Sequence, residues 1–473
     1  MMVALMRRVR FARALRSRRF ALLWSGQTIS AVGDGAFFTA MAWQVLLLTG
    51  SAAAMGATLI AQTVPLVLFM LLGGVVADRL PRRLTLLWSD TGRAVVTLVV
   101  AGLGFTGHLQ FWHLITLSAL FGLAEAFFRP AIQSIPPELV PVEDLSSANA
   151  LSSFTRSVTT LVGPAIGATL VGIASPAGAF AFDGLTFVIS AICLLMMGRV
   201  DGVARPRAVA QAPVPAESEL APVSAGLLPG VQLDAPTALA SASEARSTLP
   251  DVAAETELGA AIPGAGRGLR GVVADIREGV SYITGSTWLW LTIALASLGN
   301  IALAPLQVTL PLLVRDSYHQ GVWLLGAVLT AVSVGSIIAT LVMGQLKRVR
   351  HRGIVAYISL LVSSAALALF GLPVGVRVAP ALGLASGVIL GAGLGIFEII
   401  WTTTMQELVP PEKLGRVSSV DWLGSLCLQP VGLALVGALS DSLGPAIIFI
   451  LGGLFSFALT LIGLTSRSIR ALD

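Results

Sequence analysis

Charged residues are scarce in this chain. They make up 12% of its 473 residues, against roughly 25% in soluble domains. Hydrophobic residues account for 55%, and the mean hydropathy is +0.86. Lysine occurs only at positions 347 and 413, so arginine supplies nearly all of the positive charge. This composition excludes a single large soluble core and is typical of a chain that crosses a membrane many times.

Cysteine is equally rare, and neither Cys193 nor Cys427 predicts a disulfide because both lie inside apolar segments. H-E-x-x-H, G-x-S-x-G and Walker A patterns are absent, as is any Gly-Lys dipeptide. The histidines show no metal-ligand spacing. The chain is therefore expected to be no enzyme and to hold no metal and no cofactor. Without an ATP-hydrolysing module, any uphill transport would draw on an ion gradient.

Twelve apolar runs are long enough to cross a bilayer, which takes about 20 apolar residues in a helix. They predict an all-α polytopic membrane protein with 12 transmembrane helices. The first six lie near residues 20–48, 52–77, 84–106, 111–131, 150–173 and 177–198. The second six lie near residues 287–313, 321–345, 354–371, 380–403, 418–439 and 444–465.

Basic residues predict the orientation. Residues 1–19 carry seven arginines and no acid, and they are interpreted as a basic cytoplasmic flank. Most of the other basic loop residues lie in the expected inner loops and in the tail at residues 466–473. The outer loops hold Arg315 and Arg377. This asymmetry places both termini in the cytoplasm. It also accounts for the net charge of +5 without a nucleic-acid partner.

The chain divides into two halves, residues 20–199 and 287–465. Between them, residues 200–266 shift to Ala, Pro, Ser and Glu, which predicts a disordered cytoplasmic linker. Residues 267–286 recover an amphipathic pattern and are expected to form a cytoplasmic surface helix. A repeat supports the division, because ELVPVEDL at 138–145 and ELVPPEKL at 407–414 share E-L-V-P-x-E-x-L. Two pseudo-symmetric six-helix halves place a substrate site between repeats.

The stretch GVVADRLPRR, residues 74–83, resembles the signature loop of the major facilitator superfamily. Pro81 stands where many members have glycine, and the equivalent loop of the second half, GQLKRVRHR at 344–352, lacks the acid. The resemblance implies the fold of that superfamily. It also implies a cytoplasmic latch between the halves, a role carried to Asp78 and Arg79. The matching residues are Gly74, Asp78, Arg79, Arg82 and Arg83.

The fifth segment contains LVGPAIGATLVG, residues 161–172, which resembles the antiporter motif of drug-exporting members at Gly163, Pro164 and Gly167. Ala168 replaces the final glycine of the motif, and close helix packing alone would also explain these residues. Residues 124–151 and 275–283 look like the bacterial enterobactin-exporter and macrolide-efflux branch. That resemblance implies a bacterial inner membrane. However, residues 113–122 lack the arginine that drug antiporters carry there, so its proton-relay role is not transferred.

Asp34 lies between two glycines about 14 residues into the first helix, roughly 20 Å along it and near the bilayer middle. An unpaired buried charge is costly, so either something pairs with Asp34 or its protonation is part of the function. Proton or substrate coupling is one interpretation, and a carboxylate satisfied by neighbouring hydroxyls or helix ends is the other. Arg156 or a substrate cation is the candidate partner. Glu125 and Arg156 are grouped with Asp34 as central-cavity residues.

Glu125 and Arg129 share one face of the fourth helix at spacing i,i+4. The repeat offset maps Arg129 onto Glu398 of the tenth helix. An Arg129–Glu398 bridge would close a cytoplasmic gate in the outward-open state. The alternative is pairing within each half, Arg129 with Glu125 alone.

The remaining membrane charges are expected to be structural. Asp90 and Arg93, three residues apart, would neutralise each other. Asp183 and Asp421 would lie near helix ends and be partly wet. Asp421 has an alternative role in the cytoplasmic latch, with Arg79 or Arg416 as its partner.

Aromatic and amide side chains are candidates for the substrate surface, with ordinary packing as the alternative for each. They are Phe37, Phe38, Trp43, Asn300, Gln307, Phe397 and Trp401.

These features predict a secondary active exporter of a bulky amphipathic small molecule, such as a siderophore or macrolide, by proton-coupled alternating access. The expected partners are this substrate, protons and the lipid bilayer, and the expected state is monomeric. Two alternatives stay open: a lysolipid or lipid flippase of the same fold, and a non-transporting membrane sensor. The sensor would need a folded cytoplasmic domain, and the long soluble stretch has a disordered composition.

Overall fold

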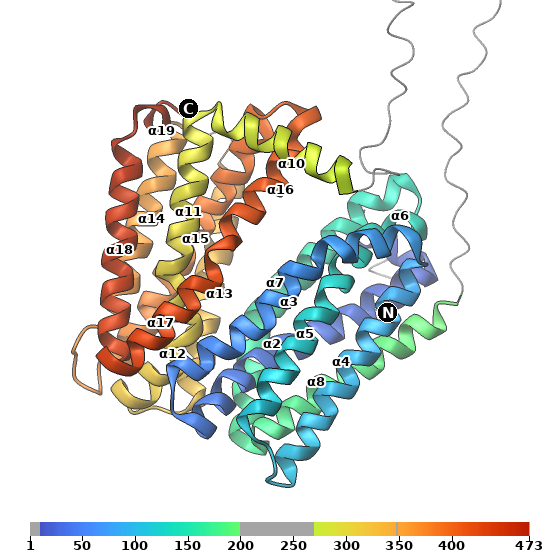
Figure 1. Ribbon diagram of the computed structural model, residues 1–473, viewed down its shortest axis with the longest axis horizontal. Coiled ribbons are helices and arrows are strands. Elements are labelled where there is room, and N and C mark those ends of the chain that lie inside the picture. The colour runs from blue at the N-terminus through green and yellow to red at the C-terminus, as the bar shows by residue number, and fades with distance from the viewer. Residues whose placement is uncertain (1–9, 199–268, 347–348, 473) are drawn as a thin grey trace, which may run out of the picture. The chain divides into compact units, whose positions relative to one another are not determined.

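The computed structural model describes residues 10–198, 269–346 and 349–472. The predicted linker at 200–266 and residues 1–9 of the basic flank lie outside this part of the chain. The described residues are helical with short connections, and eleven of their helices are long and apolar enough to cross a membrane. Figure 1 shows the two halves as groups of long helices.

The N-terminal half begins with the short helix η1 (Arg10–Arg16), which packs on α7 through a hydrogen bond from the Ala14 amide to Ser147 Oγ at 3.1 Å. Ser17 caps the long first helix, and Gly50, with φ of 64°, ends it in the left-handed conformation that suits glycine. The remaining elements are α2 (Arg18–Thr49), α3 (Ala52–Arg79), α4 (Arg82–Phe105), α5 (Phe111–Ser134), α6 (Pro136–Leu139), η2 (Val142–Asp144), α7 (Leu145–Ala174) and α8 (Pro176–Met196).

The C-terminal half begins with α10 (Leu269–Thr284), where the amphipathic helix is predicted. Arg416 pairs with Glu278 of this helix at 2.7 Å. The following elements are α11 (Thr287–Val308), α12 (Leu310–Leu312), η4 (Leu313–Ser317), α13 (Val322–Gln345), α14 (Arg352–Leu369), α15 (Ala379–Leu408), α16 (Pro411–Cys427), α17 (Gln429–Leu443), α18 (Pro445–Thr465) and α19 (Arg467–Arg470).

The segment expected near 418–439 consists of two helices, α16 and α17, which meet at Leu428. Pro430 follows the junction, and a proline has no backbone N–H to continue a helix and clashes with the preceding turn. Each piece is shorter than a membrane span, so the break accounts for eleven single spanning helices where twelve segments are predicted. The twelve-helix order is otherwise as the sequence indicates.

An identical ion pair braces each half. Arg82 at the start of α4 contacts Glu138 at 2.6 Å, and its guanidinium also donates to the Ser134 carbonyl at 2.7 Å. In the second half, Arg352 at the start of α14 pairs with Glu407. The two glutamates are the first residues of the repeated E-L-V-P-x-E-x-L motif. The repeat therefore preserves a bridge from the start of the third helix of each half to the segment at the end of its fourth helix, on α6 in the first half and on α15 in the second.

The two halves meet through α3 with α17 and through α7 with α13. Glycines allow the close approach: a Cβ on Gly56 would lie 2.6 Å from the Leu433 carbonyl oxygen, and one on Gly326 would lie 2.4 Å from Ala168 Cβ. Ser333 Oγ of α13 also donates to the Thr160 carbonyl of α7 at 2.7 Å. Small residues at helix contacts are typical of membrane bundles, where apolar contact alone gives little advantage over lipid.

Asp441 of α17 caps the first turn of α3 in the other half. Its carboxylate accepts hydrogen bonds from Ser51 Oγ at 2.6 Å, the Ala52 amide at 2.7 Å and the Ala53 amide at 3.2 Å. A carboxylate at a helix N-terminus satisfies amides that have no intrahelical partner and meets the positive end of the helix dipole. This contact joins the halves by charge and hydrogen bonding as well as by packing.

Replacing Asp441 with alanine is expected to destabilise this conformation, because losing an N-cap costs about 1 kcal/mol. The Asp441→Ala protein in detergent should melt at a lower temperature than the parent protein. The neighbouring Ser442→Ala is the matched control, since that exposed hydroxyl donates only to the Leu439 carbonyl of its own helix. Equal melting temperatures for Asp441→Ala and the parent would contradict the role of the cap.

Candidate functional site

Asp34 lies beside Arg93 of α4. Arg93 Nη1 is 4.0 Å from Asp34 Oδ2, and Arg93 Nη2 is 2.6 Å from Asp90 Oδ1. The arginine side chain is 3% exposed, whereas Asp34 is 28% exposed. Arg93 thus joins a fully buried carboxylate to one that solvent can reach. The expected partner Arg156 instead donates to Ser153 Oγ on its own helix at 2.9 Å.

Asp90 is held in place by three donors. Besides Arg93, Ser190 Oγ donates to Asp90 Oδ2 at 2.7 Å and Gln27 Nε2 donates to the same oxygen at 3.1 Å. The Asp90–Arg93 pair is therefore present, as expected. The Arg93 guanidinium also faces Asp34 of α2. The spacing of Asp90 and Arg93 along α4 gives no information about this partner on another helix.

Three aromatic rings surround the guanidinium of Arg93. Its Cζ lies 4.4 Å from the ring centroids of Phe128 and Phe187, and 5.5 Å from that of Phe121. A cation over aromatic faces is stabilised by the ring quadrupoles, most strongly where water is excluded. These rings come from α5 and α8, so four helices position one arginine.

Asp183 of α8 is fully buried, which corrects the expectation that it would be partly wet. Among the described residues, neither of its carboxylate oxygens has a hydrogen-bond partner, and the same is true of Asp34 Oδ1 and Arg93 Nε. Asp183 Oδ1 lies 2.6 Å from the position that a Cβ on Gly33 would take. Asp183 therefore contacts α2 at the residue before Asp34, and the site contains three carboxyl groups and one guanidinium.

The two glycines beside Asp34 make room for different neighbouring helices. Gly33 makes room for Asp183 and Thr186 of α8, as the short Cβ distances show. Gly35 contacts α7, because a Cβ there would lie 2.7 Å from Gly163 Cα. A Cβ on Gly167 would likewise lie 2.7 Å from the Ala36 carbonyl oxygen. The helix-five motif thus packs α7 against the segment that carries Asp34.

Glu125 and Arg129 form an ion pair in this conformation. Arg129 Nη2 lies 2.6 Å and Nε 2.8 Å from Glu125 Oε1. This is the intrahelical pairing that the sequence left open. The Arg129–Glu398 bridge is expected for the outward-open state, so it stays a prediction.

Of the signature-loop residues, Arg82 makes the brace described above. Arg83 donates through Nε to the Leu194 carbonyl at 2.6 Å and through Nη2 to the Leu195 carbonyl at 3.1 Å. Both arginines thus satisfy carbonyl groups near helix ends. The backbone of Gly74, Asp78 and Arg79 forms the last turns of α3, but the side chains of Asp78 and Arg79 lie outside the described part of the structure.

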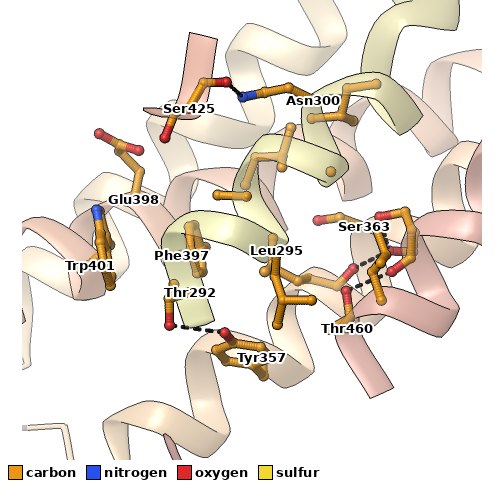
Figure 2. Close-up of a pocket in the computed structure, with 18 of the residues that line it drawn as sticks. Thr292, Leu295, Asn300, Tyr357, Ser363, Phe397, Glu398, Trp401, Ser425 and Thr460 are labelled. Carbon is orange, nitrogen blue, oxygen red and sulfur yellow. Dashed lines mark hydrogen bonds between the residues drawn. The ribbon is translucent and has the colours of Figure 1, made fainter. Parts of the chain in front are cut away.

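The C-terminal half contains a cavity of about 360 Å³ between its helices (Figure 2). Three of the predicted substrate-surface residues line it, and two carboxyl groups join them. Trp401 Nε1 donates to Asp421 Oδ2 at 3.2 Å. The side chain of Arg79 lies outside the described residues, so the latch role of Asp421 stays a prediction. The predicted residues are Asn300, Phe397 and Trp401, and the carboxyl groups belong to Glu398 and Asp421.

The other substrate-surface candidates lie elsewhere. Phe37 is 2% exposed and its ring stacks on Phe121 with centroids 4.9 Å apart, so packing is its role here. Phe38 is exposed, and Gln307 accepts a hydrogen bond from Gln429 Nε2 at 3.4 Å. Trp43 packs against hydrophobic clusters of both halves.

Comparisons with known proteins agree with this architecture. The family model of the Major Facilitator Superfamily matches residues 23–425. Macrolide efflux protein A of Streptococcus pyogenes is 21% identical over 459 residues, covering 96% of this chain and 97% of the relative. Multidrug efflux pump Tap of Mycolicibacterium fortuitum is 26% identical over 476 residues, covering 96% of each chain.

Solved transporters share the fold. A bacterial homologue of the iron transporter ferroportin, in an inward-facing state, superposes with a TM-score of 0.63 at 16% identity, covering 95% of this chain and 99% of that one. A bacterial homologue of the human lysosomal transporter Spinster gives a TM-score of 0.62 at 13% identity, covering 96% of both chains.

The packing around Asp34 predicts that Gly35 tolerates no side chain. In Gly35→Ala the new Cβ would meet backbone, so α2 and α7 must move apart at a cost of about 1–3 kcal/mol. The melting temperature in detergent should fall clearly. Gly92→Ala is the control, because nothing lies within 4 Å of a Cβ there and alanine is the better helix former. Equal stability of the two variants would refute the close contact.

Proposed function

Since this chain belongs to the Major Facilitator Superfamily, we propose that it is a secondary active exporter of a bulky amphipathic small molecule, driven by proton exchange through alternating access. Transport between two faces of a membrane needs two halves that can rearrange around a shared site. The halves meet here through glycine-rich contacts, a carboxylate cap and a hydrophobic cluster to which both halves contribute.

The direction of transport is proposed from the relatives. One matched protein is named for macrolide efflux and another for multidrug efflux, and each aligns along nearly its whole length. The glycine-rich helix-five motif resembles that of exporters and packs beside Asp34. Together these support export in preference to import.

The coupling site is the observation that carries the proposal. Asp34 and Asp90 both face Arg93, and the unpartnered Asp183 packs against the residue before Asp34, so one arginine accompanies three carboxyl groups. Leaving two uncompensated negative charges in so dry a site would cost several kcal/mol. Protons or a cationic substrate therefore complete the charge balance. Asp34 is the group that exchanges protons, because it is the one of the three carboxyl groups that solvent can reach. Asp90 keeps Arg93 in position.

The working context follows from the family. The chain is a multi-pass membrane protein whose basic flanks and loops support a bacterial inner-membrane location with both termini in the cytoplasm. It acts as a monomer and catalyses no covalent chemistry under this proposal. The linker at 200–266 and the helix at 267–286 connect the two transporting halves on the cytoplasmic side.

Asp34→Asn is expected to uncouple transport from the proton gradient, because the amide keeps the size of the side chain and cannot exchange a proton. In liposomes, macrolide flux by the variant should be the same with and without an imposed pH gradient. Asp316→Asn is the control, since this exposed carboxylate pairs with Arg315 outside the membrane helices. Gradient-driven transport by Asp34→Asn across the pH range would end the coupling proposal. Lipid movement independent of the gradient would favour a flippase instead.

The cytoplasmic gate is tested by a charge swap. Arg129→Glu and Glu398→Arg should each reduce flux, since each leaves two like charges facing one another in the closed gate. The double swap restores one opposite pair and should recover much of the lost flux in the same liposome assay. If the double variant is as inactive as the two single variants, the Arg129–Glu398 bridge does not form. Pairing of Arg129 with Glu125 within one half is then the remaining interpretation.

A further inference from the structure

The cavity of the C-terminal half has two unlike walls. Figure 2 shows Phe397, Glu398 and Trp401 on one side and Ser363 and Thr460 on the other. The first side carries aromatic rings and carboxyl groups, and the second carries hydroxyls. At about 360 Å³, the space is within the usual range for small-molecule sites.

The aromatic wall is ordered by its own contacts. The rings of Phe397 and Trp401, one turn apart on α15, are stacked at 6.3 Å with an interplanar angle of 6°. Trp288 meets Trp401 edge-on at 5.9 Å, and Tyr357 meets Phe397 edge-on at 6.4 Å. Held in this way, the rings present fixed π faces at little entropic cost on binding.

Both charges of the cavity are negative. Glu398 is an exposed side chain on α15, and Asp421 of α16, which is hydrogen-bonded to Trp401, lines the same cavity. Among the described residues that line the cavity, none is lysine, arginine or histidine. The nearest cation along α16, Arg416, pairs with Glu278 of α10. An anionic molecule would therefore meet repulsion here, and a cationic one attraction.

The hydroxyl groups that line the cavity are mainly acceptors. The hydroxyls of Ser363, Ser364, Thr460 and Thr292 donate to backbone carbonyls of their own helices, so their lone pairs are what remains for a ligand. Because Thr292 donates elsewhere, the Tyr357 hydroxyl donates to Thr292 Oγ1 at 3.0 Å.

Two further lining donors are used in the same way. Asn300 Nδ2 donates to the Ser425 carbonyl at 2.7 Å, and the indole N–H of Trp401 is taken by Asp421. Among the described lining residues, the Ser425 hydroxyl and the second N–H of Asn300 are donors that have no such partner. A wall rich in acceptors suits a ligand that brings its own donors or positive charge.

From these observations we propose that the cavity of the C-terminal half binds an organic cation with an apolar or aromatic body, its charge directed at Glu398 and Asp421 and its body against Phe397 and Trp401. Such a cation would be the substrate of the proposed exporter, and this role of the cavity in transport rests on the proposed function. The binding site itself is separate from the Asp34 cluster, which lies wholly on helices of the other half.

The predicted cytoplasmic gate would use one of the carboxyl groups of this site. Arg129, held by Glu125 in this conformation, is expected to reach Glu398 when the cytoplasmic side closes. A bound cation and Arg129 would then compete for one carboxylate. Release of the substrate and closure of the gate would become a single exchange of partners at Glu398.

The test compares two ions of similar size and shape and opposite charge. Equilibrium dialysis of the full chain in detergent should show saturable binding of tetraphenylphosphonium and no saturable binding of tetraphenylborate, with protein-free micelles as the blank. Glu398→Gln should weaken tetraphenylphosphonium binding roughly tenfold, the effect of about 1.4 kcal/mol. Trp401→Leu should weaken it by about three- to tenfold through the lost π face.

Glu407→Gln is the matched control. It removes the same charge from the same helix, but Glu407 pairs with Arg352 and does not line the cavity. Its affinity for tetraphenylphosphonium should equal that of the parent protein. Phe397→Leu, which keeps an apolar side chain, is a second cavity variant if Trp401→Leu does not fold.

Equal binding of the two ions, or equal affinities of the Glu398→Gln and Glu407→Gln proteins, would overturn the assignment. The measurement needs no gradient and no liposome. A failure of gradient-driven transport with intact cation binding would therefore reject the proposed function and keep this site. Intact gradient-driven transport with no cation binding would reject this site and keep the proposed function.

Discussion

The interior of the N-terminal half depends on the solvation of one guanidinium. Arg93 is 3% exposed and is stabilised by Asp90, by Asp34 and by aromatic rings from two helices. Removing water from so many charged groups is expensive, so each helix that supplies a partner is constrained in its rotation and depth. The positions of α2, α4, α5 and α8 follow from this shared requirement.

Close packing imposes the second constraint. The glycines next to Asp34 allow two different neighbours, a buried carboxyl group on α8 and the glycine motif of α7, to approach the same turn of α2. A larger residue at either position would separate the helices and change the distance between Asp34 and Arg93. The glycine motif of α7 and Asp34 are therefore parts of one packing arrangement, although they lie more than a hundred residues apart in the chain.

The two halves have diverged around a common frame. Each keeps the arginine–glutamate brace of the repeat, Arg82 with Glu138 and Arg352 with Glu407. Inside that frame, the first half buries a compact cluster of charges with one arginine. The second half leaves a cavity bounded by acids, aromatic rings and hydroxyl acceptors. Under the proposed function, this division would let one half handle protons and the other hold the substrate.

The sequence by itself determined the number and order of membrane segments, the repeat and the superfamily, because hydrophobic length, arginine placement and the spacing of a loop motif are local properties. It also singled out Asp34, Phe397, Glu398 and Trp401 as notable. Only the tertiary structure decided which charges meet. The sequence predicts the Asp90–Arg93 pair and a partly wet Asp183, but it predicts neither the contact of Arg93 with Asp34 nor the burial of Asp183, because spacing along one helix carries no information about the helix that packs against it. Likewise, the cap by Asp441 depends on a contact between distant segments, which the linear pattern does not encode.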